Sequence, residues 1–237
     1  AQVWLWRQTN QLVAGEKVWE GLRDKDASFT TAKMFWWYNM YSSAEWSATP
    51  RPIYRADGAK HPGSYTYPMG LNDELEAELG TFPLFKFWGP MTSIESTKWI
   101  SDSTIHVMKK NQPNLSLVYL PHLDYNLQRL GPNDPAIAKD VRELDECIGD
   151  LRNCAEQLDY AVLILSEYGI QEVDKPIHIN RELRKAGLIK VRMECGEEQF
   201  DAGASDAFAV ADHQLAHVYV NDKTKLAQVE EMLKKLD

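Results

Sequence analysis

Two stretches decide the fold of this chain, Leu115-Ser116-Leu117-Val118-Tyr119-Leu120 and Tyr160-Ala161-Val162-Leu163-Ile164-Leu165. Each is a short apolar run bounded by turn residues, a pattern that is typical of a buried strand. A helical stretch separates them, so together they predict a βαβ unit with parallel strands. Ligands bind outside the carboxyl ends of such strands. Because Asp124 follows the first run and Glu167 follows the second, both are candidates for chemistry.

The connecting segment, residues 134–158, is predicted to form one amphipathic helix. Asp134 suits the N-cap and Pro135 suits the first helical position, where no intrahelical donor is needed. The opposite face is charged, Glu143 included, and we interpret it as solvent-exposed. Apolar residues recur at steps of three and four, which is the period of a helix face, at Ile137, Val141, Leu144, Ile148, Leu151, Ala155 and Leu158.

The remaining sequence alternates predicted strands and helices, which indicates an α/β fold. We expect a mainly parallel sheet with helices on both faces, in a single domain over residues 1–237. The chain begins inside an aromatic segment and ends on a charged helix, so we expect it to be part of a larger catalytic domain. Further strands are predicted at residues 29–38, 188–193, 207–211 and 216–220, and further helices at 15–22, 72–79, 96–110 and 179–186.

Residues 41–67 are rich in Pro, Gly, Ser, Thr and Tyr and show neither a helical nor a strand period. They predict a long loop excursion, and we expect it to cover the site, because long loops are often functional. The aromatic cluster at its start offers rings that could stack a base or an organic substituent of a substrate, although such clusters more often belong to a core. The candidates are Trp37, Tyr38, Asn39 and Tyr41.

Composition restricts the class of protein. The net charge is 26 − 35 = −9, which argues against a nucleic-acid duplex or an anionic membrane as partner. Three cysteines do not make a disulfide framework and suit a reducing compartment. No stretch approaches the roughly 18 apolar residues of a membrane-spanning helix. We therefore predict a cytoplasmic protein; the sequence does not predict its oligomeric state.

Three segments carry a family resemblance. Asp124-Tyr125-Asn126-Leu127-Gln128-Arg129-Leu130-Gly131-Pro132 resembles the Asp-x-x-x-His-x-x-Gly-Pro motif of the alkaline phosphatase superfamily. Ser166-Glu167-Tyr168-Gly169-Ile170 is similar to that family's Ser-Asp-His-Gly-Met after an apolar strand, and residues 176–188 are similar to its Asn-x-x-Leu-x-x-x-Gly segment. The resemblance spans about residues 15–190, and its nearest branch is the type I phosphodiesterases and nucleotide pyrophosphatases.

The resemblance implies an alkaline-phosphatase-like fold, a divalent metal, usually zinc, at the strand ends, and hydrolysis of a small phosphate-ester or nucleotide-like substrate. In this family Asp and His side chains bind two ions, which stabilise charge on the phosphoryl group. Asp124 matches a ligand carboxylate, and Glu167 stands where the family has Asp. Gln128 and Tyr168 stand where it has His, and amides and phenols are poor zinc ligands. This departure leaves open whether two ions, one or none bind.

The family nucleophile would lie upstream of Ala1, so we expect this chain alone to be inactive. Our first interpretation is a metal-dependent phosphate-ester hydrolase in which Asp124 and Glu167 bind the metal. Further residues are candidates for altered ligands or for groups that orient the ligands, namely His122, Gln128, Tyr168 and His213.

Two alternatives remain. A catalytically degenerate protein on the same fold would bind a phosphate-containing ligand or act as a scaffold, since Gln128 and Tyr168 replace histidines. An unrelated α/β hydrolase or transferase is the third interpretation. No Gly-x-Ser-x-Gly elbow, P-loop or Gly-x-Gly-x-x-Gly supports it.

Overall fold

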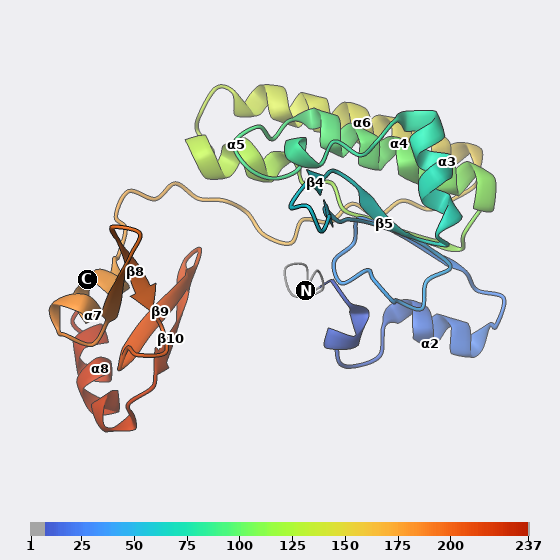
Figure 1. Ribbon diagram of the computed structural model, residues 1–237. Helices are drawn as coiled ribbons and strands as arrows, with labels where there is room; N and C mark the ends of the chain where they lie inside the picture. The colour runs from blue at the N-terminus through green and yellow to red at the C-terminus, as the bar shows by residue number, and fades with distance from the viewer. Residues whose placement is uncertain (1–7, 237) are drawn as a thin grey trace. The chain divides into compact units, whose positions relative to one another are not determined.

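A computed structural model describes residues 8–236 (Figure 1). By its internal contacts the chain divides into two compact units, Ala1–Glu172 and Val173–Asp237, and each is described by itself. We predicted a single domain over residues 1–237. Whether both units belong to one catalytic domain in the natural protein stays a prediction.

The first unit is built on a four-stranded sheet in the order β5-β2-β1-β6. Strand β1 pairs in parallel with β2 and with β6, while β5 pairs antiparallel with β2. The mainly parallel sheet of an α/β fold is therefore confirmed. The strands are β1 (Thr31–Met34), β2 (Trp46–Pro50), β5 (Ser64–Tyr67) and β6 (Leu115–Val118).

Helices cover both faces of this sheet. Ala32 and Met34 of β1 point to one face, where they join a buried core with Trp99 and Ile100 of α4. Lys33 points to the other face, where its Nζ lies 4.3 Å from the ring centroid of Trp19 in α2. This alternation is the side-chain period of a strand. The helices are α2 (Val18–Lys25), α3 (Gly70–Leu79), α4 (Ile94–Asn111), α5 (His122–Leu130) and α6 (Ile137–Gln157), with short 3-10 turns η1 (Asn10–Leu12) and η2 (Leu84–Lys86).

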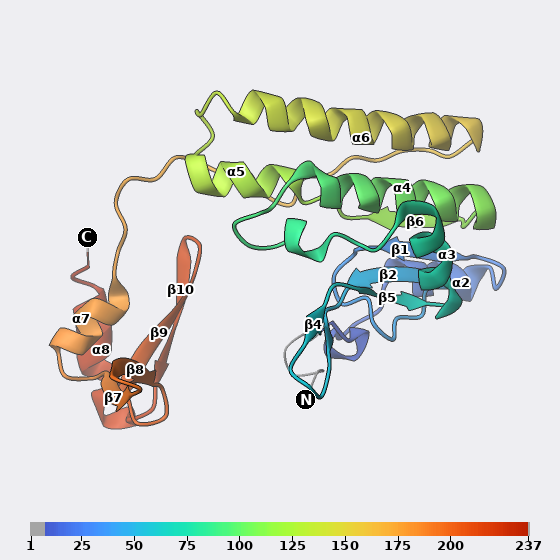
Figure 2. The ribbon, with the colours of Figure 1, turned by 45° about the horizontal axis from the view of Figure 1, so that its top comes forward.

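Helices α4 and α6 run side by side above the sheet (Figure 2). Ser101 Oγ donates a hydrogen bond of 3.2 Å to the carbonyl of Cys147, which ties the two helices together. The prediction of α6 is confirmed, with its start at Ile137 rather than at Pro135. Asp134 still acts just before it, because its Oδ1 accepts a hydrogen bond of 2.8 Å from the backbone of Ala136.

The prediction of a loop over residues 41–67 was wrong in large part, because the segment contains β2 and β5 of the main sheet. Strand β2 was not predicted because both of its faces are buried and its buried residues, Ala48 among them, are small. Ser47 and Thr49 are each 1% exposed, so the strand shows no contrast between apolar and polar positions. A small hairpin, β3 (Ile53–Tyr54) and β4 (Lys60–His61), lies between β2 and β5.

The second strand of the predicted βαβ unit is also a correction. Residues 160–165 form no strand, and Val162, Leu163, Ile164 and Leu165 are 51% to 81% exposed. Among the described residues β6 pairs with β1 alone and is an edge strand. A run of apolar residues needs a partner strand to form ladder hydrogen bonds, and this run has none here.

The second unit contains two hairpins and two helices, and its own core consists of Leu183, Leu188, Ala207, Ala209 and Val229. Strand β9 pairs with β10 and β7 with β8, all antiparallel. The predicted helix over residues 179–186 and the predicted strands over 188–193, 207–211 and 216–220 are confirmed, whereas the strand over 197–201 was not predicted. Its elements are α7 (Ile179–Lys185), β7 (Lys190–Glu194), β8 (Glu197–Asp201), β9 (Ala207–Asp212), β10 (Leu215–Val220), η3 (Lys223–Lys225) and α8 (Leu226–Leu233).

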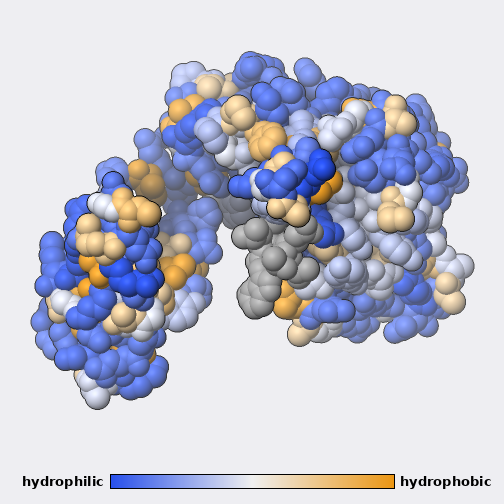
Figure 3. Space-filling view, in the orientation of Figure 1, coloured by the Kyte–Doolittle hydropathy of each residue, from blue (hydrophilic) through white to orange (hydrophobic). Residues whose placement is uncertain are grey.

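The visible surface of each unit is largely hydrophilic, with scattered apolar residues (Figure 3). Within residues 8–236, none of the helices is long and apolar enough to cross a membrane.

Candidate functional site

Asp124 lies in the first turn of α5, just beyond the carboxyl end of β6. The connection is short and held by the backbone. Tyr119 N donates to the carbonyl of Met34 on the neighbouring strand at 3.1 Å, and Asp124 N donates to the carbonyl of Pro121 at 3.0 Å. The carboxylate therefore stands where ligands bind in parallel sheets.

The segment that carries the second motif returns to this point. Tyr168 Oη donates a hydrogen bond of 2.5 Å to Asp124 Oδ2, and Ser166 Oγ donates to the carbonyl of Tyr168 at 2.7 Å. Burial, the bond to Asp124 and the nearby carboxylates, Glu167 included, raise the pKa of the Tyr168 phenol. Tyr168 is thus a neutral donor to Asp124.

The pKa of Tyr119 is affected by both acidic residues, Asp124 and Glu167. Burial first, then the charges of Asp124 and Glu167, raise the pKa of Tyr119 to about 12. Both carboxylates therefore act on one phenol, although the second motif is not part of the sheet. Asp124 and Tyr168 meet at the end of β6, and Glu167 directly precedes Tyr168 in the chain.

Asp124 borders a hollow of about 410 Å³. Gln128, one helical turn after Asp124, and Arg129 also line it, so an amide and a cation face the same space as the carboxylate. Arg129 donates to Asn126 Oδ1 in the preceding turn. The other side is formed by the turn around Phe87 and by residues that follow β6; the lining residues are Phe87, Trp88, Gly89, Pro90, Thr92, Tyr119, Pro121, Asp124, Tyr125, Gln128 and Arg129.

Aromatic rings stand along this side of the hollow. Trp37 stacks on Trp88 with ring centroids 6.2 Å apart and contacts Tyr119 with centroids 5.7 Å apart. Trp37 and Trp88 are 40% and 41% exposed, so each ring is partly accessible to solvent. Of the predicted substrate residues, Trp37 is therefore placed next to the hollow.

The other predicted substrate residues lie differently. Tyr41 is exposed and packs edge-on against Tyr65, and Tyr38 is exposed with φ +51°. Asn39 is fully buried, and its Nδ2 donates to the carbonyls of Lys33 at 2.7 Å and Ala48 at 2.8 Å. A buried amide that holds two strands offers no surface to a ligand, so Asn39 is a structural residue here.

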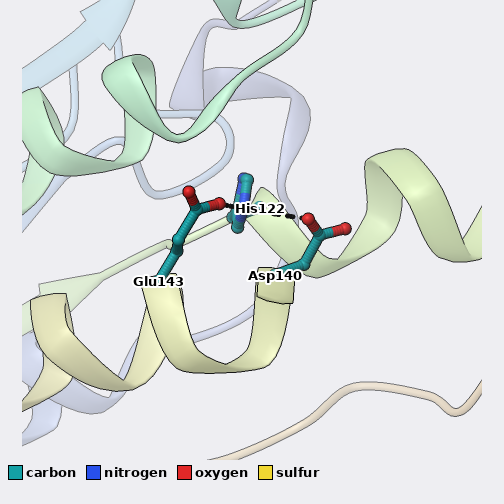
Figure 4. Close-up of side chains that lie close together, drawn as sticks. All are labelled: His122, Asp140 and Glu143. Atoms are coloured by element: carbon teal, nitrogen blue, oxygen red, sulfur yellow. Dashed lines mark hydrogen bonds and ion pairs between the residues drawn. The ribbon is translucent and has the colours of Figure 1, made fainter. Parts of the chain in front are cut away.

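A second group of titratable side chains lies between α5 and α6 (Figure 4). His122 Nε2 is 3.2 Å from Glu143 Oε2 and 3.7 Å from Asp140 Oδ1. His122 and Asp140 are each 4% exposed. We interpreted Glu143 as part of a solvated face, yet its carboxylate turns inward; the spacing of Asp140 and Glu143 by three residues was the available signal.

His213 belongs to the second unit. It occupies the turn between β9 and β10 with φ +53°, and its Nε2 lies 3.6 Å from Asp212 Oδ1. Both side chains are more than 60% exposed. This turn joins the two strands that the sequence predicted over residues 207–211 and 216–220. The other predicted site residues all belong to the first unit.

The comparisons with known proteins bear on the whole chain. It has no match among curated proteins or solved structures. The model of one family, described as Type I phosphodiesterase / nucleotide pyrophosphatase, matches residues 1–236. Members of that family act on small phosphate esters and nucleotides and are typically metal-dependent. Since the match covers nearly every residue, the chain belongs to the type I phosphodiesterase/nucleotide pyrophosphatase family.

Proposed function

We propose that this chain carries the metal-binding and substrate-facing part of a metal-dependent hydrolase of phosphate esters, of phosphodiesterase or nucleotide pyrophosphatase type. One observation carries the proposal: the Tyr168–Asp124 hydrogen bond joins the two family motifs beside an open hollow. Two motifs that are far apart in sequence would not need to meet if their matches were accidental.

The residues present fit a divalent ion held mainly by oxygen. Asp124 Oδ2 is engaged by Tyr168, which leaves Oδ1 for a metal, and Glu167 is exposed nearby. Carboxylate oxygens bind zinc at about 2.0–2.2 Å, and they also suit magnesium and manganese. We propose zinc, in one ion or two. Once bound, the ion would stabilise negative charge on the phosphoryl group.

The neighbouring residues have separate roles in this proposal. Tyr168 orients Asp124 from behind, because a neutral phenol that already donates to a carboxylate is a poor ligand. Arg129 and Gln128 face phosphate oxygens, for which a guanidinium is well suited. Trp37 and Trp88 take the organic substituent of the ester by stacking.

A second candidate function is binding without catalysis, and Tyr168 favours it. The family histidine at this position would be a nitrogen ligand, whereas Tyr168 donates to Asp124 instead. A degenerate member would keep the hollow and the aromatic rings while its phosphoryl-transfer chemistry was lost.

Hydrolysis by the full natural polypeptide separates the two functions. We expect bis-p-nitrophenyl phosphate to be cleaved faster than p-nitrophenyl phosphate, and Glu167→Gln to slow the diesterase activity by about 100-fold or more, a loss typical of key catalytic groups. Full activity of Glu167→Gln, or no cleavage of either ester in the presence of divalent metals, would contradict the hydrolase proposal. A cytoplasmic location stays a prediction, which cell fractionation tests.

A further inference from the structure

The group formed by His122, Asp140 and Glu143 has the spacing of a metal site. One ligand atom from each residue lies within 4.8 Å of the other two. Tetrahedral zinc with nitrogen and oxygen ligands at about 2.0–2.1 Å holds neighbouring ligand atoms about 3.3 Å apart. The separations from His122 Nε2, 3.2 Å to Glu143 and 3.7 Å to Asp140, are close to that value. The two carboxylate oxygens lie within 4.8 Å of each other, so both carboxylates would draw together when the ion binds.

The surrounding residues hold the carboxylates in this arrangement. Asn126 Nδ2 donates to Asp140 Oδ2 at 2.7 Å, and Lys139 Nζ lies 3.4 Å from Glu143 Oε1. The other oxygen of each carboxylate, Oδ1 and Oε2, faces the imidazole. Groups that fix the far oxygen of a ligand are a regular feature of metal sites, because they orient the near one.

Burial of the two carboxylates favours the binding of a cation to this cluster. The side chains of His122 and Asp140 are 5% and 6% exposed and that of Glu143 is 26% exposed. Two carboxylates face one imidazole here, and Lys139, whose side chain is 70% exposed, lies beside only one of the carboxylates. Buried charges without compensation are costly. A divalent ion would neutralise both carboxylates.

We propose that His122 Nε2, Asp140 and Glu143 bind one zinc ion, with water as the fourth ligand on the partly exposed side of Glu143. Asp140 and Glu143 share one face of α6 because they are three residues apart, and His122 is the first residue of α5. The ion would therefore link the start of α5 to α6 and hold in place the helix that carries Asp124.

This site is separate from the one at Asp124. Two residues along a helix differ in direction by about 200°, so His122 and Asp124 point to opposite sides of α5. His122 faces α6, whereas Asp124 faces Tyr168 and the hollow. One ion cannot take ligands from both sides, so the two sites can be removed independently.

Titration with Co²⁺, monitored by absorption of visible light, tests the proposal. Co²⁺ can occupy zinc sites, and its tetrahedral complexes absorb in the visible range. The protein is the 237-residue chain carrying Asp124→Asn and Glu167→Gln, which lacks both carboxylates of the other site. We expect one equivalent of Co²⁺, displaced by zinc. Adding Glu143→Gln should weaken cobalt binding at least tenfold, whereas adding Glu146→Gln, an exposed residue of the same helix, should not change it.

The outcomes are distinguishable. Glu143→Gln keeps the shape of the side chain, so we expect the protein that carries it to fold, with an unchanged circular dichroism spectrum. Zinc should raise the melting temperature of the Asp124→Asn/Glu167→Gln chain. It should not raise the melting temperature of the same chain with Glu143→Gln added. If that chain binds no ion while the unaltered chain does, the ion belongs to Asp124 and the proposal is overturned without affecting the proposed function. Cobalt binding that survives Glu143→Gln also overturns it.

Discussion

Tyr168 donates its phenolic proton to Oδ2 of Asp124 at 2.5 Å, although 44 positions separate the two residues. The bond joins two segments that the sheet does not connect, since residues 160–165 form no strand. This hydrogen bond holds the second motif next to Asp124.

Removing the Tyr168 hydroxyl should loosen Asp124. In Tyr168→Phe the carboxylate loses its orienting donor, and we expect zinc affinity at Asp124 to fall about tenfold, the lower end of the loss seen for such partners. Competition with a chromophoric chelator measures this. Tyr160→Phe, in a partly buried residue packed in a different cluster, is the control, and an equal loss there would show a general effect on folding.

The burial of Tyr119 should make the stability of the fold depend on pH in the alkaline range. Its pKa is raised to about 12 from an ordinary value of 10, so the unfolded chain releases this proton at lower pH than the folded chain does. Stability must therefore fall as the pH rises from about 10 to about 12. Urea unfolding across that range, compared between the unaltered chain and Tyr119→Phe, tests it; an identical pH dependence of the two proteins would contradict the assignment.

Lys33 should destabilise the fold at neutral pH. It is fully buried in β1, and its Nζ has no hydrogen-bond partner within the described part of the chain. Burial lowers the pKa of Lys33 to about 8 from 10.5. The unfolded state thus binds more protons between these values, and stability should rise with pH from about 8 to about 10.5.

Replacing Lys33 by Met removes the buried charge and keeps most of the side-chain volume. We expect Lys33→Met to raise the free energy of unfolding at pH 7 by roughly 1 to 3 kcal/mol, consistent with the size of that pKa shift, and to abolish this pH dependence. Thermal or urea unfolding at pH 7 and pH 10 gives the comparison. A less stable variant would show that the contact with Trp19 outweighs the cost of burial.

The aromatic side of the hollow should act on substrate affinity. Stacking of an aromatic substituent is worth about 0.5–1.5 kcal/mol, so Trp88→Ala should raise KM for an aryl phosphodiester roughly 2- to 10-fold and leave KM for an alkyl phosphodiester nearly unchanged. Trp36→Ala removes a tryptophan of similar exposure that does not line the hollow. Equal effects of the two variants would argue against stacking.

Local pattern predicted part of the regular structure. The stripe from Ile137 to Leu158 specified α6, and the apolar run before Pro121 specified β6. Strand β2 was missed because it is buried on both faces, with Ser47 and Thr49 each 1% exposed, so its sequence shows no alternation of apolar and polar residues. Conversely, the apolar residues 162–165 have strong strand preference but no partner among the described residues, so preference alone did not make a strand.

The candidate site was predictable in part. Asp124 could be placed from the strand end that precedes it, and the motif resemblance indicated the family. The role of Tyr168 as a donor to Asp124 could not be predicted, because it depends on how residues 158–168 return to the end of β6. The burial of Asn39, and the meeting of His122 with Asp140 and Glu143, depend on how α5 packs on α6 and how β1 packs on β2, which no single segment encodes.

Metal content tests the central claim most directly, namely that Asp124 binds a divalent ion at the end of β6. The chain, Asp124→Asn and the control Asp145→Asn, an exposed residue of α6, should be dialysed against zinc and analysed by atomic emission. Our account predicts that Asp124→Asn loses one equivalent of zinc and that Asp145→Asn loses none. An unchanged zinc content in Asp124→Asn would contradict it.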